Sequence, residues 1–73
     1  MKATQCDKVL DYMKQFGTIT QFDALRDIGC MRLASRISDL RQQGVAIGRR
    51  MKTSKNRYGD DVYFAEYYLI EED

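Results

Sequence analysis

Residues 29–44 read GCMRLASRISDLRQQG, a stretch with a glycine at each end and no proline. Between the glycines, the apolar residues Leu33, Ala34, Ile37 and Leu40 fall within an arc of roughly 120° when successive residues are placed about 100° apart. This spacing predicts a helix over residues 31–43 that buries one face and ends at Gly44. The opposite face then carries arginine, serine and amide side chains.

A short helix is expected directly before this stretch, over residues 20–28. Thr20 is a helix-capping residue type, and Asp23 stands three positions after it, which is an acidic variant of the capping box. One face of this helix comprises Phe22, Leu25 and Ile28. We expect a tight turn at Gly29, with Leu25 buried where this helix crosses the helix over 31–43.

A further helix is expected over residues 4–16. Thr4 and Asp7 repeat the capping pattern, and Gly17 ends the segment. Its apolar stripe comprises Cys6, Val9, Leu10, Met13 and Phe16. Three helices are therefore predicted in the first 43 residues.

After Gly44 the hydrophobic period changes from that of a helix to that of a strand. Val45, Ile47 and Met51 alternate with small or basic residues, and residues 62–70 are rich in aromatic and β-branched types. Turn-forming residues fill positions 53–60, so the two strands should form a hairpin over about 45–70. The pattern predicts one α+β domain over residues 1–73, with a three-helix core followed by a C-terminal β-hairpin.

The composition excludes several classes of protein. With 44% hydrophobic residues and five tyrosines the chain is too apolar for a disordered tail, but 73 residues is near the lower limit for an independent core, which leaves a homodimer open. The chain has no histidine, and its two cysteines, Cys6 and Cys30, have no CxxC spacing, so neither a metal nor a cofactor is expected. We interpret both cysteines as buried, reduced thiols.

No long apolar run and no signal-like N-terminal segment is present, which predicts a soluble cytoplasmic protein without membrane contact. No acid/base pair, partnered nucleophile or phosphate-binding glycine loop indicates an enzyme.

Two helices joined by a short turn with glycine form a helix-turn-helix. At this point the chain resembles the winged helix-turn-helix family, in particular small phage and prophage DNA-binding domains. The motifs that carry the resemblance are Gly17-x-Ile19-Thr20-x-x-x-Ala24-Leu25-x-x-Ile28-Gly29, Arg32-Leu33-Ala34-x-Arg36-Ile37-x-x-Leu40-Arg41-x-x-Gly44 and Tyr67-x-Leu69. The resemblance covers roughly residues 4–70. It implies that the third helix enters the major groove of DNA and that the hairpin acts as a wing against the backbone or minor groove.

Charge is sorted along the chain. Residues 31–58 hold eight Lys/Arg and one acid, a net +7, whereas residues 1–30 balance and residues 59–73 carry six acids and no base. This order indicates a dipolar molecule with a basic surface of the kind that binds a polyanion, although a solvated face is the alternative reading.

The polar face of the third helix carries the residue types that read base edges in the major groove. Arginine pairs with guanine, amide side chains pair with adenine, and serine pairs with either. The residues of these types are Arg32, Ser35, Arg36, Asp39 and Gln42. Asp39 either accepts from cytosine N4 or orients Arg36 or Arg32 through an ion pair at helical spacing, and the ion pair is the preferred reading.

The hairpin supplies a second set of candidates, which we expect to form a mobile cluster that contacts phosphates. They are Arg49, Arg50, Lys52, Lys55, Asn56 and Arg57, with Tyr58 beside them. Arg57 is the first choice for entering a narrow minor groove. One reading places the backbone amides of Thr20 and Gln21 against a phosphate, but simple capping by Thr20 is the preferred reading.

The aromatic residues have two readings. They would stack single-stranded bases on an open sheet, or they would cover the helical core. We prefer the second and assign Phe64 or Tyr67, together with Leu69, to packing, with Tyr12 and Tyr68 half exposed. A last strand with two apolar faces would leave one of them as a dimer surface.

These observations predict a non-enzymatic protein that binds double-stranded DNA sequence-specifically, as a small transcriptional regulator of phage or prophage type. One alternative is an excisionase-like architectural factor that bends DNA. Another is a protein-interaction winged helix that does not bind DNA.

Overall fold

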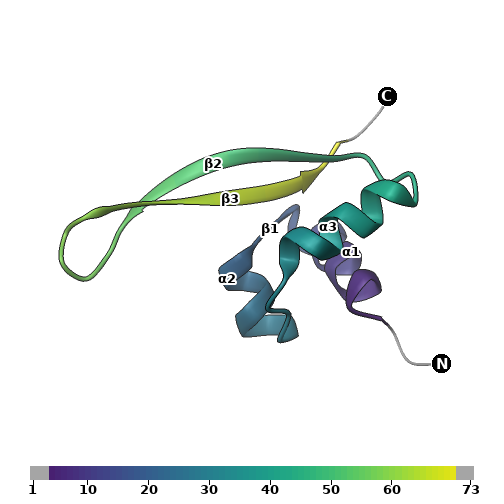
Figure 1. The fold of residues 1–73 in the computed structure, drawn as a ribbon, viewed down its shortest axis with the longest axis horizontal. Helices are drawn as coiled ribbons and strands as arrows, with labels where there is room; N and C mark the ends of the chain where they lie inside the picture. Colours follow the sequence, from purple (N-terminus) through teal and green to yellow (C-terminus); the bar gives the residue numbers. More distant parts are fainter. Residues whose placement is uncertain (1–3, 71–73) are drawn as a thin grey trace.

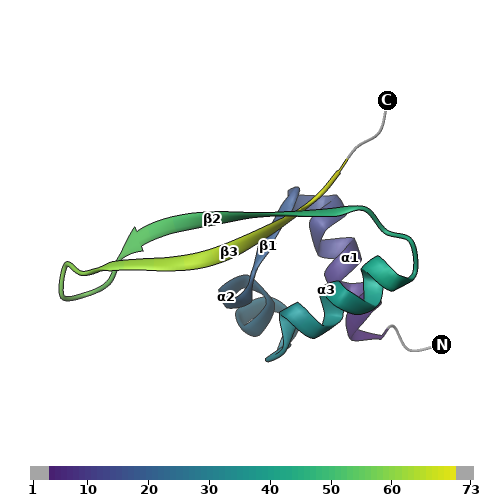
Figure 2. The same cartoon turned by 45° about the horizontal axis from the view of Figure 1, so that its top comes forward.

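The computed structural model describes residues 4–70 and has the predicted α+β architecture, with helices followed by an antiparallel hairpin (Figure 1). The elements in chain order are α1 (Gln5–Phe16), β1 (Thr18–Thr20), α2 (Gln21–Asp23), the π-helical segment η1 (Ala24–Ile28), α3 (Leu33–Gln42), β2 (Ile47–Lys55) and β3 (Asp61–Leu69). The hairpin lies over one side of the helices and extends well beyond them (Figure 2).

Both predicted capping boxes are confirmed. The Thr4 hydroxyl accepts from the backbone N–H of Asp7, and the Asp7 carboxylate accepts from the backbone N–H of Thr4. Thr20 and Asp23 make the same reciprocal pair at the start of α2, with both distances at 3.1 Å. Each box satisfies two backbone donors that a helix start would otherwise leave without a partner.

The segment after Gly17 forms a strand that the sequence did not reveal. β1 pairs antiparallel with β3, with Thr18 opposite Tyr68 and Thr20 opposite Glu66. Three residues are too few to show a strand period, so the sequence predicts no strand between the first two helices. The sheet order is β1-β3-β2.

Because β1 reaches only residues 66–68 of β3, the outer part of the sheet is a two-stranded ribbon. Pairing in this ribbon continues from Ile47 opposite Leu69 to Lys55 opposite Asp61. We call residues 47–69 the wing.

The core lies where α1, α3 and the base of the sheet meet. Its buried residues are Val9, Met13, Ile19, Ala24, Cys30, Leu33, Ile37, Leu40, Ile47 and Tyr67. The predicted inward positions of α1 and α3 are therefore confirmed at Val9, Met13, Leu33, Ile37 and Leu40.

The predicted burial of the second helix is wrong. Leu25 is 51% exposed and Phe22 is 68% exposed, whereas Ala24 is fully buried and Ile28 is half-buried. The inward positions Ala24 and Ile28 are four residues apart, so the inward face passes through Ala24 and not through Phe22 and Leu25. The segment from Ala24 to Ile28 has π-helical hydrogen bonding. α3 packs chiefly on α1 rather than across the second helix.

Three smaller expectations also differ from the structure. Ala34 is exposed, so the apolar arc of α3 is narrower than predicted. Phe16 is 62% exposed and packs against Tyr12, with ring centroids 4.6 Å apart. The third helix begins at Leu33 instead of residue 31, because Arg32 has a non-helical backbone.

Candidate nucleic-acid interface

The outward side of α3 is available for contact with a ligand. Its exposed residues are Ala34, Ser35, Ser38, Arg41 and Gln42, and Arg32 lies exposed just before the helix. The side chains of Arg32, Ser35 and Gln42, three of the predicted base readers, make no hydrogen bond or ion pair within residues 4–70. The fold therefore does not use their polar groups.

Arg36 and Asp39 lie on a different flank of α3, against α1. Their side chains form an ion pair of 3.4 Å, which is the pairing expected for Asp39 at helical spacing. The Cys6 thiol lies 3.9 Å from the Asp39 carboxylate, and the Nε atom of Arg36 is buried without a hydrogen-bond partner within the described residues. Burial, and then the charge of Asp39, raise the pKa of the Cys6 thiol. Arg36 is thus less exposed to an incoming groove than Arg32.

The start of α3 is held by a side chain from α2. Gln21 Nε2 donates to the backbone carbonyl of Cys30 at 2.8 Å, and Gln21 Oε1 accepts from the backbone N–H of Leu33 at 3.0 Å. Arg32, at the N-cap position, makes no capping hydrogen bond. Gln21 therefore satisfies a helix-terminal donor and fixes the turn of the helix-turn-helix, a role that sequence reasoning missed. No local pattern reveals it, because the partners are nine and twelve residues away.

The end of α3 is tied to the wing in a similar way. Arg41 Nη2 donates to the backbone carbonyl of Ile47 at 3.1 Å, where β2 begins. This hydrogen bond links the last turn of the helix to the first residue of the hairpin. Gln21 thus positions the start of α3 relative to the turn before it, and Arg41 positions its end relative to the strand after it.

Several charges of the wing are paired with one another. Arg50 lies 2.7 Å from Glu66, Lys52 lies 3.9 Å from the same carboxylate, and Lys55 lies 2.7 Å from Asp61. Antiparallel pairing places the bases of β2 opposite acids of β3 that are far away in the sequence. The wing, residues 47–69, holds five bases and three acids and so carries +2. The basic and acidic blocks of the sequence therefore lie side by side in the hairpin.

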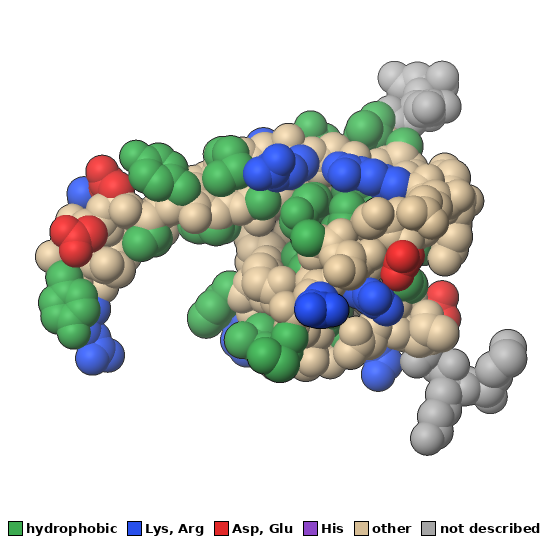
Figure 3. All heavy atoms as spheres, in the orientation of Figure 1, with side chains coloured by type: hydrophobic (Ala, Val, Ile, Leu, Met, Phe, Trp, Pro, Cys, Tyr) green, Lys and Arg blue, Asp and Glu red, His purple; other side chains and the backbone are tan. Residues whose placement is uncertain are grey.

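The bases that remain without an ion pair within residues 4–70 include three candidate DNA contacts, which are Arg32, Arg49 and Arg57. They come from the start of α3, from β2 and from the tip of the wing. Figure 3 shows Lys and Arg side chains over α3 and β2 and at the tip, all visible from one side of the molecule. The three elements therefore present basic groups to the same approach direction.

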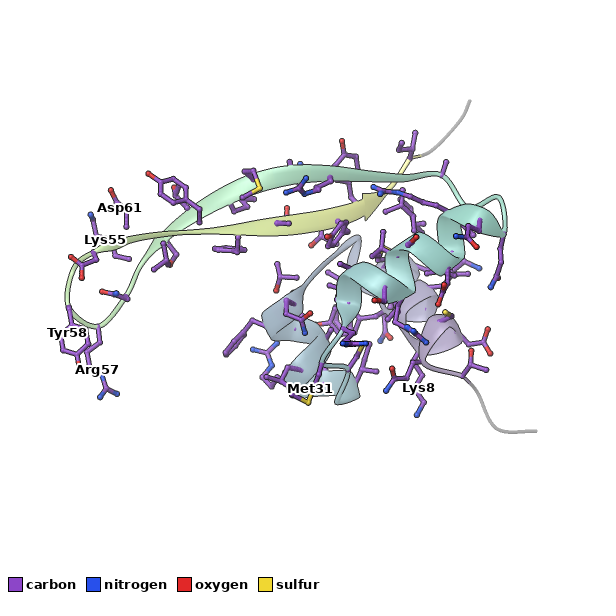
Figure 4. All side chains as sticks on the ribbon, viewed as in Figure 1. Lys8, Met31, Lys55, Arg57, Tyr58 and Asp61 are labelled. Carbon is purple, nitrogen blue, oxygen red and sulfur yellow. The ribbon has the colours of Figure 1, made fainter. Side chains whose placement is uncertain are left out.

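The tip of the wing is a hydrogen-bonded turn. The Asn56 carboxamide oxygen accepts from the backbone N–H groups of Tyr58 and Asp60, at 2.9 and 3.0 Å. Asn56 is thus a structural residue of the turn, and its side-chain oxygen is already used. Arg57 and Tyr58 project from the curled end of the wing towards the side on which the helices lie (Figure 4).

The assignment of an aromatic residue of β3 to the core is confirmed at Tyr67, whereas most other aromatic residues of the described chain are exposed. Tyr67 is buried and Leu69 is half-buried, but Phe64 is 36% exposed. Tyr12 and Tyr68 are half-buried, and the Tyr12 hydroxyl donates to Asp27 at 2.7 Å. Arg50 lies over the Tyr68 ring, 5.1 Å from its centroid, so this face of the ring is covered and does not offer a stacking surface for a base.

Within residues 4–70, no cluster of three or more acidic, cysteine or histidine side chains is arranged to hold a metal ion. No helix of the same segment has the length and apolar character needed to cross a membrane. Both cysteines are free thiols, with Cys30 buried and Cys6 half-buried. The Thr20 hydroxyl caps its helix as preferred.

Two comparisons with known proteins bear on this arrangement. A search of curated proteins found no match to the chain. The family model of the winged helix-turn-helix domain matches residues 4–72, which is nearly the whole chain. This fold is typical of DNA-binding proteins without enzymatic activity, and it suggests DNA as a partner. From the match and from the order of its helices and hairpin, the chain belongs to the winged helix-turn-helix domain family.

Proposed function

We propose that this protein binds double-stranded DNA sequence-specifically and acts as a small transcriptional regulator of phage or prophage type. The observation that carries the proposal is the outward side of α3. Arg32, Ser35 and Gln42 there are exposed and unused by the fold, and they are the side-chain types that read guanine and adenine in the major groove. A protein of this kind would act in the cytoplasm of a bacterial or phage-infected cell.

The wing supports the same orientation. With α3 in the major groove, Arg49 on β2 and Arg57 at the tip lie on elements that would follow the adjacent backbone. Arg57 is the proposed minor-groove residue, because it projects from a turn fixed by Asn56. Arg50, Lys52 and Lys55 would contribute less, since each already faces a carboxylate.

The experiment is selection of bound sites from randomised duplexes, followed by a titration of the selected duplex at increasing salt. If about four to seven phosphates are contacted per chain, log K should fall with log salt with a slope of about −0.9 for each contact. Lys8→Ala, which removes an exposed base from α1, is the control and should leave the affinity nearly unchanged. The proposal would be contradicted if the selection enriched no site and the affinity for duplex DNA hardly changed with salt.

The same selected duplex separates a regulator from an architectural factor. An excisionase-like protein would bend the duplex strongly, which a circular-permutation or energy-transfer assay detects. Absence of duplex binding at low salt would instead favour the protein-interaction reading.

A further inference from the structure

The outward side of α3 carries an apolar side chain among polar ones. Leu33, Ile37 and Leu40 of this helix are buried, whereas Ala34 is exposed. The sequence predicts Ala34 in the core, yet the fold leaves it outside the buried cluster. Its methyl group therefore stands on the proposed DNA face and takes no part in the packing of the core.

Ala34 lies on the same arc as exposed polar residues of the helix. With about 100° between successive residues, Ala34 and Ser38 are separated by about 40° around the helix axis, and Ser35 lies beyond Ser38. All three residues are exposed. Figures 1 and 2 show that one side of α3 is free of other elements of the described chain. A helix that enters a groove with this arc brings the Ala34 methyl group close to the bases.

The short side chains of this arc favour deep entry into a major groove. The groove is about 12 Å wide, and a helix with its side chains has a diameter of about 10–12 Å, so the fit is close. Ala34, Ser35 and Ser38 are short, whereas the longer Arg32 and Gln42 stand at the two ends of the helix. The middle of α3 can therefore approach the base edges closely, while the long side chains reach further along the groove.

An apolar side chain has one matching partner among the base edges of the major groove. These edges present hydrogen-bond donors and acceptors, apart from the C5-methyl group of thymine. Contact between two methyl groups removes apolar surface from water on both sides. If Ala34 instead faced the amino group of cytosine or the oxygen of guanine, that group would lose water without gaining a hydrogen bond. Ala34 therefore favours thymine both by contact and by disfavouring other bases.

We propose that Ala34 contacts the C5-methyl group of a thymine in the DNA site. The inference rests on the proposed function, because it names a base that α3 reads once the helix lies in the major groove. Polar side chains cannot supply the same discrimination. A hydrogen bond to the O4 atom of thymine forms equally well with uracil, which lacks only the methyl group.

The test replaces each thymine of the selected duplex in turn, on both strands, by deoxyuridine. This change removes the methyl group and keeps every hydrogen-bonding group of the base. The affinity of the full chain is then measured for the thymine duplex and for each uracil duplex. At one position in the site the parent should bind thymine about fourfold more tightly than uracil, the effect of one buried methyl group. Ala34→Gly should abolish this preference, because the variant lacks the contacting methyl group.

Ser38→Gly is the matched control. Ser38 is also exposed on the outward side of α3, and this variant also places a glycine in the helix. It should keep the thymine preference of the parent at that position, whatever its effect on the affinity for both duplexes. Thermal unfolding checks that Ala34→Gly is folded. If it is not, Ala34→Ser takes its place, because this variant exchanges the apolar methyl group for a polar hydroxymethyl group.

The proposal would be overturned by a selected site without thymine, or by a parent that binds every uracil duplex as tightly as the thymine duplex. In the second case DNA binding would stand, and Ala34 would serve only as a good helix former. A thymine preference that survives in Ala34→Gly, or that is lost equally in Ser38→Gly, would also contradict the assignment to Ala34. Failure of the chain to select any duplex would instead remove the proposed function itself, and the methyl contact with it.

Discussion

The ring of Tyr68 lies across Gly48 on the neighbouring strand, in the space that a side chain at position 48 would occupy. The two residues are directly paired in the antiparallel register of β2 and β3. A Cβ built on Gly48 would overlap the Cζ, Cε2 and hydroxyl atoms of Tyr68. Glycine is therefore required here for close side-chain packing and not for an unusual backbone angle. The contact fixes the base of the wing, next to the cation–π pair of Arg50 and Tyr68.

Gly48→Ala should destabilise the protein by about 1–3 kcal/mol, because the Tyr68 ring must leave its place. Chemical denaturation measures the loss. In a Tyr68→Ala background the same substitution should cost much less, since the obstructing ring is gone. An equal cost in both backgrounds would show that the ring does not lie over Gly48.

Gln21→Ala should lower the free energy of unfolding by about 1–3 kcal/mol. The substitution removes both hydrogen bonds of the side chain and leaves the Leu33 N–H without its partner. Gln15→Ala is the control, because Gln15 is exposed on α1, and it should stay within about 0.5 kcal/mol of the parent. Similar effects from the two substitutions would mean that Gln21 does not hold the turn.

Ile37→Ala and Leu25→Ala should differ strongly in how much they lower the free energy of unfolding. Ile37 is 1% exposed, so its truncation should cost about 2–5 kcal/mol, most of the stability of so small a domain. Leu25 is 51% exposed, and its truncation should cost well under half as much. Melting temperatures of the two variants check this order. A larger fall in melting temperature for Leu25→Ala than for Ile37→Ala would show that Leu25 is buried and would contradict the described face of the second helix.

Asp27 should contribute to stability in a pH-dependent way. The Arg26 guanidinium, and then the Tyr12 hydroxyl, lower the pKa of the Asp27 carboxyl through hydrogen bonds. The unfolded state therefore takes up the proton at a higher pH than the folded state. The stabilisation is complete above the ordinary carboxyl pKa, near pH 4, and is lost as pH falls through the lowered folded value.

Unfolding free energies measured from neutral to acid pH test this dependence. Asp27→Asn should lower stability at neutral pH and should lose less on acidification than the parent does. Asp11→Asn removes an exposed carboxylate from α1 and serves as the charge-matched control. Parallel pH profiles for the parent and Asp27→Asn would contradict the assignment.

Local signals in the sequence were the most reliable. The capping boxes at Thr4 and Thr20 join residues three positions apart, so residue type and spacing suffice to predict them. The inward face of α3 followed from its period, because that helix is regular. The hairpin followed from the change of period after Gly44.

Most of the missed features depend on contacts between residues that are far apart in the sequence. The exception is the inward face of the second helix, where the pattern favours the large residues Phe22 and Leu25 but the fold buries the small Ala24. The partnership of Arg50 with Glu66 depends on the strand register, which couples positions 16 residues apart. For the candidate site, residue types indicated the exposed arginines, but only the fold distinguishes Arg32, which is unpaired within residues 4–70, from Arg36, which is ion-paired.

The central claim is that α3 reads bases while the wing holds the backbone. The most direct measurement compares Arg32→Ala with Arg49→Ala on the selected duplex and on a scrambled duplex of the same length. Arg32→Ala should lose about 1–3 kcal/mol on the selected duplex alone and relax preference at one base pair, whereas Arg49→Ala should weaken binding to both duplexes nearly equally. If Arg49→Ala changes base preference and Arg32→Ala weakens both duplexes alike, α3 is not the element that reads the sequence.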